Sequence, residues 1–280
     1  LFRVGLFSCE ALPRNGCSPG HSMSVQQGPL DLRELGGSVA VVTGAANQGI
    51  GWGLAQHCAS LGMAVAIVDL RDALCQRAAE QLRELQPGAE AVGIGCDVAD
   101  EGSMAACAAA VERAFPGRPL GAVFANAGVL FNKTILGSSL EDWKTTLNVN
   151  VLGVVNTIKA FVPAMQRQPT PSVVCATASV GGLVRGDGGA GSYQASKHAV
   201  VAICETLSFE LAARYPQIRV HVLCPCIANS ALPTTSQTNK AVERGELPEV
   251  TEHPHQPSLP RGPCSPCCPI SHPPFILRYE

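Results

Sequence analysis

The chain has 280 residues, enough for one large domain or two small ones. It is 46% apolar and only 15% charged, which is typical of a well-buried core, and 5% aromatic content favours an α/β interior packed with Val, Ala and Leu. A net charge of −2 predicts no nucleic-acid partner, and no apolar run approaches about 18 residues, so we expect no membrane span.

Residues 1–36 contain Pro, Gly, Ser and scattered Arg, without the apolar core of a secretory signal. Arg3 and Arg14, against the single early acid Glu10, favour a transit peptide, while Met23 is an alternative start. Both interpretations stay open. We treat 1–36 as an extension that is disordered or carries a targeting signal, and we expect a cytoplasmic protein unless this extension directs it to an organelle.

The chain contains thirteen cysteines, a number that would be typical of a protein held together by disulfide bonds. Most lie inside apolar segments, where we expect small buried thiols in a reducing compartment. Examples are Cys58, Cys96, Cys107, Cys175, Cys204 and Cys224.

From Ser38, short Val, Ile and Ala runs alternate with longer segments of helical period, which is typical of βαβ units and a parallel sheet. The predicted strands are 39–43, 64–68, 91–96, 122–125, 173–176 and 219–223. The predicted helices are 51–61, 72–85, 103–115, 140–166 and 192–215. The strands are apolar throughout, as expected when helices cover both faces.

Residues 231–280 are rich in Pro and show no sustained periodicity, which predicts a disordered tail. A gene-model error in this tail is an alternative. A zinc site is a further alternative, but it needs a folded scaffold and we expect no metal. Its ligands would come from Cys264, Cys267, Cys268, His253, His255 and His272.

A glycine-rich turn with Gly44, Gly49 and Gly51 follows the first predicted strand and leads into a helix. Glycines let the backbone approach a pyrophosphate, and the free N–H groups of a helix N-terminus favour an anion. The pattern therefore predicts a dinucleotide site. The alternative is a tight strand–helix turn without a ligand.

Polar residues end the next strands. Asp69 would accept hydrogen bonds from ribose hydroxyls and repel a 2′-phosphate, which favours NAD over NADP, although Arg71 would partly offset that repulsion. Asp97 would bind a purine amine, or alternatively cap the next helix. Small residues at 126–128 leave room for a cofactor over the sheet edge.

Tyr193 and Lys197 stand four residues apart, so they share one face of a helix, and Ser179 ends an apolar run upstream. A nearby ammonium favours phenolate, which predicts a lowered tyrosine pKa and a proton-transfer site. The alternative is an ordinary exposed pair.

In their order over roughly residues 38–230, these elements resemble the short-chain dehydrogenase/reductase family. The resemblance implies one Rossmann-type domain over 37–230, with a doubly wound parallel sheet in a three-layer αβα sandwich that lacks its last strand, and a nicotinamide dinucleotide cofactor. The implied cofactor contacts are Gly44, Gly49, Ile50, Gly51, Asp69, Asp97, Val98, Asn126, Ala127, Gly128, Tyr193, Lys197 and Ile227.

The resemblance also implies catalytic roles. Tyr193 would be the general acid/base, Lys197 would lower its pKa and hold the nicotinamide ribose, and Ser179 would polarise the carbonyl. Asn150 would keep a water in a proton relay, with Asn148 as the rival assignment. The implied activity is an NAD(P)-dependent oxidoreductase acting on CH–OH groups of a small alcohol or carbonyl substrate, in a homodimer or homotetramer.

The sequence departs from the family pattern in three places. Four residues rather than three separate Gly44 from Gly49, Cys226 and Ser230 replace the usual Gly and Thr, and the final helix and strand are not recognisable. An alternative function is therefore a catalytically impaired dinucleotide-binding or interaction protein. A third is an NADPH-dependent carbonyl reductase.

Overall fold

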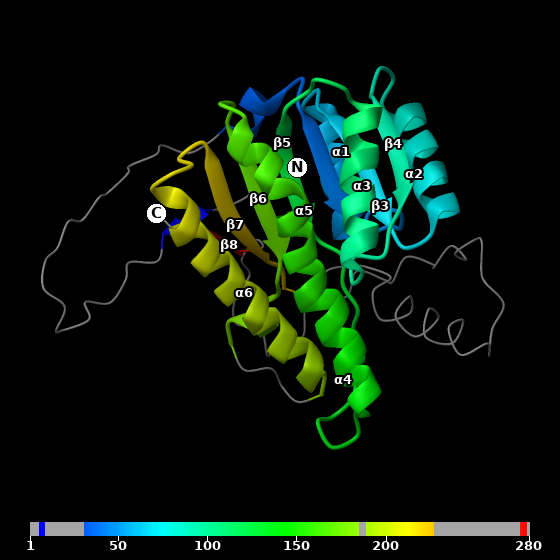
Figure 1. Cartoon of the computed structure of the whole chain (residues 1–280). Helices are drawn as coiled ribbons and strands as arrows, with labels where there is room; N and C mark the ends of the chain where they lie inside the picture. The colour runs from blue at the N-terminus through cyan, green and yellow to red at the C-terminus, as the bar shows by residue number, and fades with distance from the viewer. Residues whose placement is uncertain (1–5, 9–30, 185–188, 227–274, 279–280) are drawn as a thin grey trace, which may run out of the picture.

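The computed structural model describes residues 6–8, 31–184, 189–226 and 275–278. Within these residues, one sheet has the strand order β1-β8-β7-β6-β5-β2-β3-β4, with helices on both faces (Figure 1). The strands are β1 (Leu6–Ser8), β2 (Val39–Thr43), β3 (Ala64–Asp69), β4 (Ala91–Gly95), β5 (Leu120–Ala125), β6 (Ser172–Thr177), β7 (Ile218–Cys224) and β8 (Phe275–Arg278). The helices are α1 (Ile50–Ser60), α2 (Asp72–Leu85), α3 (Glu101–Ala114), α4 (Leu140–Leu147), α5 (Gly153–Arg167) and α6 (Gly191–Ala212).

The strands from β2 to β7 pair in parallel, in the spatial order β4-β3-β2-β5-β6-β7. The chain therefore builds the sheet outward from β2 to one edge, returns to β5, and builds to the other edge. In such doubly wound sheets, ligands bind at the carboxyl ends of the strands where the order reverses. The structure confirms the predicted Rossmann-type three-layer fold.

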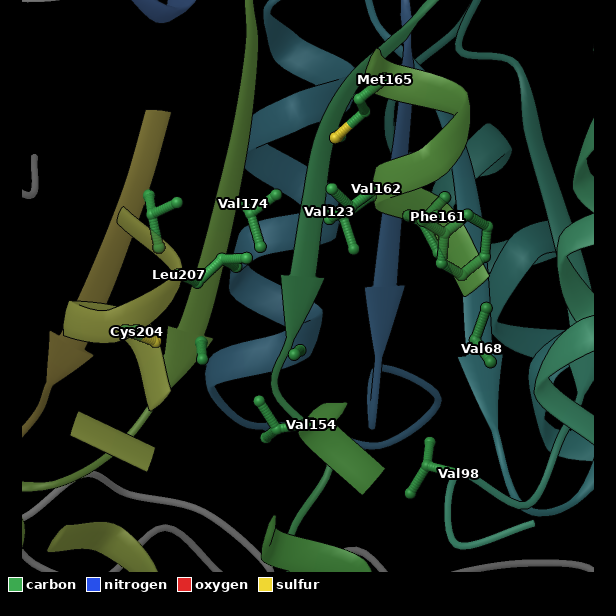
Figure 2. Packing of buried hydrophobic residues seen from close by; sticks show 14 of the residues in the cluster. Val68, Val98, Val123, Val154, Phe161, Val162, Met165, Val174, Cys204 and Leu207 are labelled. Carbon is green, nitrogen blue, oxygen red and sulfur yellow. The ribbon is translucent and has the colours of Figure 1, made fainter. Parts of the chain in front are cut away.

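Alternate residues of the strands serve two separate hydrophobic layers. Val41 of β2 packs in the layer formed with α3, α5 and α6, whereas Val42 packs in the layer formed with α1 and α2. Both faces of each central strand are thus buried, which explains the uninterrupted apolar runs in the sequence. In Figure 2, side chains of α5 and α6 lie against the strands in the first layer, namely Phe161, Val162, Met165, Cys204 and Leu207.

The two outermost strands were not predicted. β8 pairs antiparallel with β7, and β1 pairs parallel with β8. The sequence pattern indicated neither strand: β1 lies in the extension 1–36 and β8 in the tail 231–280, and β8 is antiparallel, so it does not continue the parallel sheet. A run of three apolar residues after two prolines is too short to show a periodicity, and its pairing with the otherwise open edge of β7 makes it a strand. Ile227, Ser230 and the proposed zinc ligands lie outside the described residues.

The predicted helix 140–166 is observed as one helical stretch, Leu140–Arg167. Its turn at Asn148–Leu152, between α4 and α5, is π-helical. By length and composition alone it could cross a membrane. Its α5 part packs against β5 and β6 and buries Phe161 and Met165 in the core. Because a buried core helix passes the same test, this is weak evidence for a membrane span.

Candidate active site

A cleft of about 360 Å³ lies at the carboxyl ends of the strands, where the strand order reverses. The structure brings most of the predicted site residues together there, although they are far apart in sequence. The cleft is lined by Gly44, Gly49, Ile50, Gly51, Asp69, Asp97, Val98, Asn126, Ala127, Gly128, Tyr193 and Lys197. Ser179 and Asn150 are not part of this lining, but they contact residues that are.

The glycine turn between β2 and α1 is closely packed. Gly44 has a φ of 66°, and a Cβ there would lie 2.7 Å from Ala127 Cα. A Cβ on Gly51 would lie 2.3 Å from Gly44 O. No described side chain caps the N-terminus of α1. The turn thus absorbs the extra residue between Gly44 and Gly49, and its small residues and uncapped helix end fit the pyrophosphate of a dinucleotide.

Asp69, the last residue of β3, is fixed against this turn. One carboxylate oxygen accepts a hydrogen bond from Ala46 N at 3.1 Å, and the other accepts one from Leu70 N at 2.8 Å. The negative charge is therefore held at the mouth of the cleft beside the glycines, where the ribose of a bound dinucleotide would lie.

Asp97 does not cap the following helix. The N-cap of α3 is Asp100, whose side chain accepts a hydrogen bond from Ser103 N. Asp97 instead accepts one from Ala99 N at 2.9 Å and lines the cleft. Of the two interpretations of Asp97, helix capping was wrong, and its carboxylate remains placed to bind a ligand.

Tyr193 and Ser179 form a hydrogen-bonded pair at the amino end of α6. Burial raises the pKa of the Tyr193 phenol above its ordinary value of 10.0, and the hydrogen bond with Ser179 acts in the opposite direction. The predicted lowering of this pKa was therefore wrong for the structure described here. The reason is that removing the phenol from water outweighs the stabilisation of phenolate by its neighbours.

Lys197 is almost completely buried, and its Nζ donates to Thr177 O at 2.6 Å. Nζ lies 5.4 Å from the centroid of the Tyr193 ring. Burial lowers the pKa of Lys197 to about 8, with a smaller opposing effect from Cys224. A lysine in this range can give up or take a proton near neutral pH.

Asn150 sits in the π-helical turn and is fully buried. Its side chain bridges the backbone of Val129, with Nδ2 donating to Val129 O at 3.0 Å and Oδ1 accepting from Val129 N at 2.8 Å. Nδ2 also donates to Ser196 Oγ at 3.0 Å. Asn148 is exposed and lines the cleft instead, so the two rival residues occupy different environments.

Comparison with known proteins identifies the family. Residues 38–241 match the family described as short chain dehydrogenase. The chain belongs to the short-chain dehydrogenase family. A short-chain dehydrogenase/reductase from Burkholderia phymatum, solved in complex with NAD, superposes with a TM-score of 0.67 at 34% identity, covering 80% of this chain and 75% of that one.

Sequence relatives cover the same region. A CLA biosynthesis dehydrogenase/reductase of Lactiplantibacillus plantarum is 31% identical over 69% of this chain and 66% of its own length. An inactive 2-(S)-hydroxypropyl-CoM dehydrogenase 2 of Xanthobacter autotrophicus is 33% identical over 61% of this chain and 70% of its own length. The short-chain dehydrogenase family uses NAD or NADP, and it includes proteins described as inactive.

Three hydroxyl residues of this short-chain dehydrogenase were not predicted from its sequence. Ser196 Oγ accepts from Asn150 and donates to Tyr193 O at 2.6 Å. Thr177 contacts Lys197, and Thr43 Oγ1 accepts from Asn126 N at 2.9 Å. Ser196 could have been found from its place three residues after Tyr193 on one helix face. Nothing in the sequence marks Thr177 except its place at the end of a strand.

The buried Lys197 gives a pH-dependent stability prediction for this short-chain dehydrogenase. The pKa in the folded state, about 8, is below the ordinary value of 10.5, so the unfolded chain binds more protons between these values. Lys197 therefore costs stability at neutral pH, and the cost disappears as pH rises towards 10.5. We expect Lys197→Met to be more stable than wild type at pH 7, with the difference shrinking by about 1 kcal/mol per pH unit above pH 8.

The measurement is urea unfolding of both proteins at several pH values. Burial raises the pKa values of the Cys58, Cys75 and Cys204 thiols, which weakens the fold at high pH in both proteins, and these effects cancel in the difference because none of the three interacts with Lys197. Lys159→Met removes a lysine whose side chain is 58% exposed and serves as the control for the loss of one positive charge. A Lys197→Met difference that does not vary with pH would contradict the prediction.

Proposed function

We propose that this chain is an NAD-dependent oxidoreductase that interconverts an alcohol and a ketone. One observation carries the proposal. The hydrogen-bonded Tyr193–Ser179 pair and the buried Lys197 lie at the same cleft as the glycine turn and Asp69. A proton-transfer group is thereby combined with a dinucleotide cradle, as alcohol oxidation requires.

The residues of the chain would divide the work as follows. When bound, the nicotinamide supplies hydride transfer to or from the substrate carbon. Tyr193 Oη would exchange a proton with the substrate oxygen, which Ser179 Oγ would hold by a hydrogen bond. Lys197 would favour phenolate at Tyr193 and would pass on the proton, which suits a lysine whose pKa is about 8.

The missing side chain of Gly128 keeps a space open between Asn150 and Lys197, and the proton passed on by Lys197 would travel through this space. A Cβ there would lie 3.2 Å from Asn150 Oδ1 and 3.6 Å from Lys197 Nζ. A water between these two polar atoms would continue the path from Lys197. Both Nδ2 hydrogens of Asn150 already have acceptors, so its remaining contribution to such a water is the free lone pair of Oδ1.

NAD is the proposed cofactor because the Asp69 carboxylate is fixed beside the glycine turn and would repel a 2′-phosphate. The proposal is tested by following NADH absorbance while the full chain is offered secondary alcohols with NAD, or ketones with NADH. Turnover supports it. Binding of NADH without turnover in a broad panel would instead support a catalytically impaired dinucleotide-binding protein.

The segments 129–140 and 189–194, which contain the cleft residues Phe131 and Tyr193, predict a preference for apolar substrates. Ile135 is 65% exposed and packs beside Gly191, two residues before Tyr193. The two segments carry a single cation, Lys133, whose Nζ is paired with Asp142 at 2.9 Å. We expect kcat/KM to rise about fourfold for each methylene added along a series of secondary alcohols, because each buried methylene contributes about 0.8 kcal/mol.

Ile135→Ser should weaken this dependence on chain length. Leu85→Ser, at a leucine of α2 that is 55% exposed and lies outside these segments, should leave it unchanged. A series with constant kcat/KM would contradict the apolar preference without affecting the proposed reaction.

A further inference from the structure

Thr177, the last residue of β6, contacts both halves of the proposed site. Its carbonyl oxygen accepts a hydrogen bond from Lys197 Nζ at 2.6 Å, on the proton-transfer side. Its Oγ1 donates to Asn126 Oδ1 at 3.0 Å, on the side of the glycine turn. The residue is only 7% exposed, so water competes little for either bond.

The hydroxyl of Thr177 determines how the Asn126 amide is oriented. Asn126 Nδ2 donates to Thr43 O at 3.0 Å and to Gly44 O at 3.2 Å. An amide presents its oxygen and its nitrogen in different directions. Because Thr177 supplies a donor on one side and the turn supplies acceptors on the other, only one orientation of the amide satisfies all of them.

The orientation of Asn126 in turn fixes the glycine turn. Nδ2 lies 2.6 Å from where a Cβ of Gly51 would be, so the amide fills the space between Gly44 and the start of α1. The position of the Gly44 carbonyl then depends on its hydrogen bond from Asn126 Nδ2. Thr177, at the end of β6, keeps the Asn126 amide in the orientation that makes this bond.

We propose that Thr177 is a positioning residue that holds the glycine turn in its dinucleotide-binding shape through Asn126 and ties it to Lys197. The inference rests on the proposed function for its relevance to catalysis, but the hydrogen bonds that carry it belong to the protein alone. Loss of the Thr177 hydroxyl leaves Asn126 Oδ1 without its donor inside the protein, so the turn should loosen.

The first test uses hydrogen–deuterium exchange of the full chain without cofactor. Thr177→Val should speed exchange in peptides covering residues 43–51 and 124–128, while Thr177→Ser, which keeps the hydroxyl, should match wild type. Thr157→Val is the matched control, because Thr157 is a buried threonine of α5 that bonds Gly153 O outside the cleft. If Thr177→Val fails to fold, Thr177→Ala compared with Thr177→Ser isolates the same hydroxyl.

The second test is NADH binding measured by fluorescence. Thr177→Val should raise the Kd about fivefold to tenfold, as expected for one hydrogen bond, and should raise the KM for NAD more than it lowers kcat. Adding Thr177→Val to Asn126→Ala should have little further effect, because Thr177 acts through Asn126. Additive effects, or a Thr177→Ser variant as weak as Thr177→Val, would overturn the proposal.

The two tests separate this inference from the proposed function. Unchanged exchange at the turn in Thr177→Val overturns the role of Thr177, whether or not the chain turns over an alcohol. Faster exchange at the turn in a chain that never oxidises an alcohol supports that role and contradicts the proposed reaction.

Discussion

Tyr193→Phe is expected to lower kcat for alcohol oxidation by about 100-fold to 10,000-fold, while the Kd for NADH changes by less than about fivefold. The phenol is hydrogen-bonded to Ser179, and Lys197 Nζ lies 5.4 Å from the centroid of its ring. Phenylalanine keeps the ring in place and removes only the oxygen that exchanges the proton. The measurement is steady-state kinetics together with NADH titration.

The control for this prediction is Tyr215→Phe, which removes a phenol oxygen beyond the end of α6 and outside the cleft. It should retain wild-type kcat. Full activity of Tyr193→Phe, within a protein shown to be active, would rule out Tyr193 as the acid/base. A wild-type chain that binds NADH but never turns over would rule out the reaction and leave the dinucleotide site.

The central fold could be predicted because its signals are local. The central strands β2, β3, β5 and β6 are buried on both faces, so their sequences are apolar runs, and the glycines near Gly44 mark where β2 ends. The family resemblance implied a doubly wound parallel sheet. The pairing of Phe275–Arg278 with β7 could not be predicted, since it depends on an open edge that exists only in the folded sheet.

The sequence indicated many of the residues that line the cleft, but not the electrostatics of the site. Tyr193 and Lys197 were recognised from their spacing, yet the direction of the Tyr193 pKa depends on how deeply the phenol is buried, which no spacing reveals. The orientation of Asn150 has a similar cause. Its side chain bonds to Val129 because a π-helical turn places it inward, and a π-helical turn has no sequence signature here.

Thr177 illustrates the limit most clearly. The sequence presents it as one more residue of an apolar strand, two positions before Ser179. Its importance arises from two contacts, with residues 51 positions earlier and 20 positions later in the chain. Contacts of that kind follow from the strand order β2-β5-β6, which brings Thr43, Asn126 and Thr177 side by side.

Asp69→Asn is expected to shift cofactor preference towards NADP, raising the ratio of kcat/KM for NADP to that for NAD by about 10-fold to 100-fold. In wild type, a 2′-phosphate would approach a carboxylate that the backbone of Ala46 and Leu70 holds in place, and like charges brought together cost several kcal/mol. Asparagine keeps an oxygen that can accept one of these bonds and removes the charge. Kinetics with both cofactors give the ratio directly.

Asp72→Asn is the matched control, since Asp72 also accepts a backbone hydrogen bond, from Gly95 N at 2.9 Å, but does not line the cleft. It should leave the ratio unchanged, which would show that the effect belongs to position 69 and not to overall charge. A wild-type preference for NADP would mean that the cation two residues on, Arg71, outweighs the carboxylate. In that case Asp69→Asn would change the ratio little, and Arg71→Ala would move it towards NAD, so the pair of variants identifies which charge selects the cofactor.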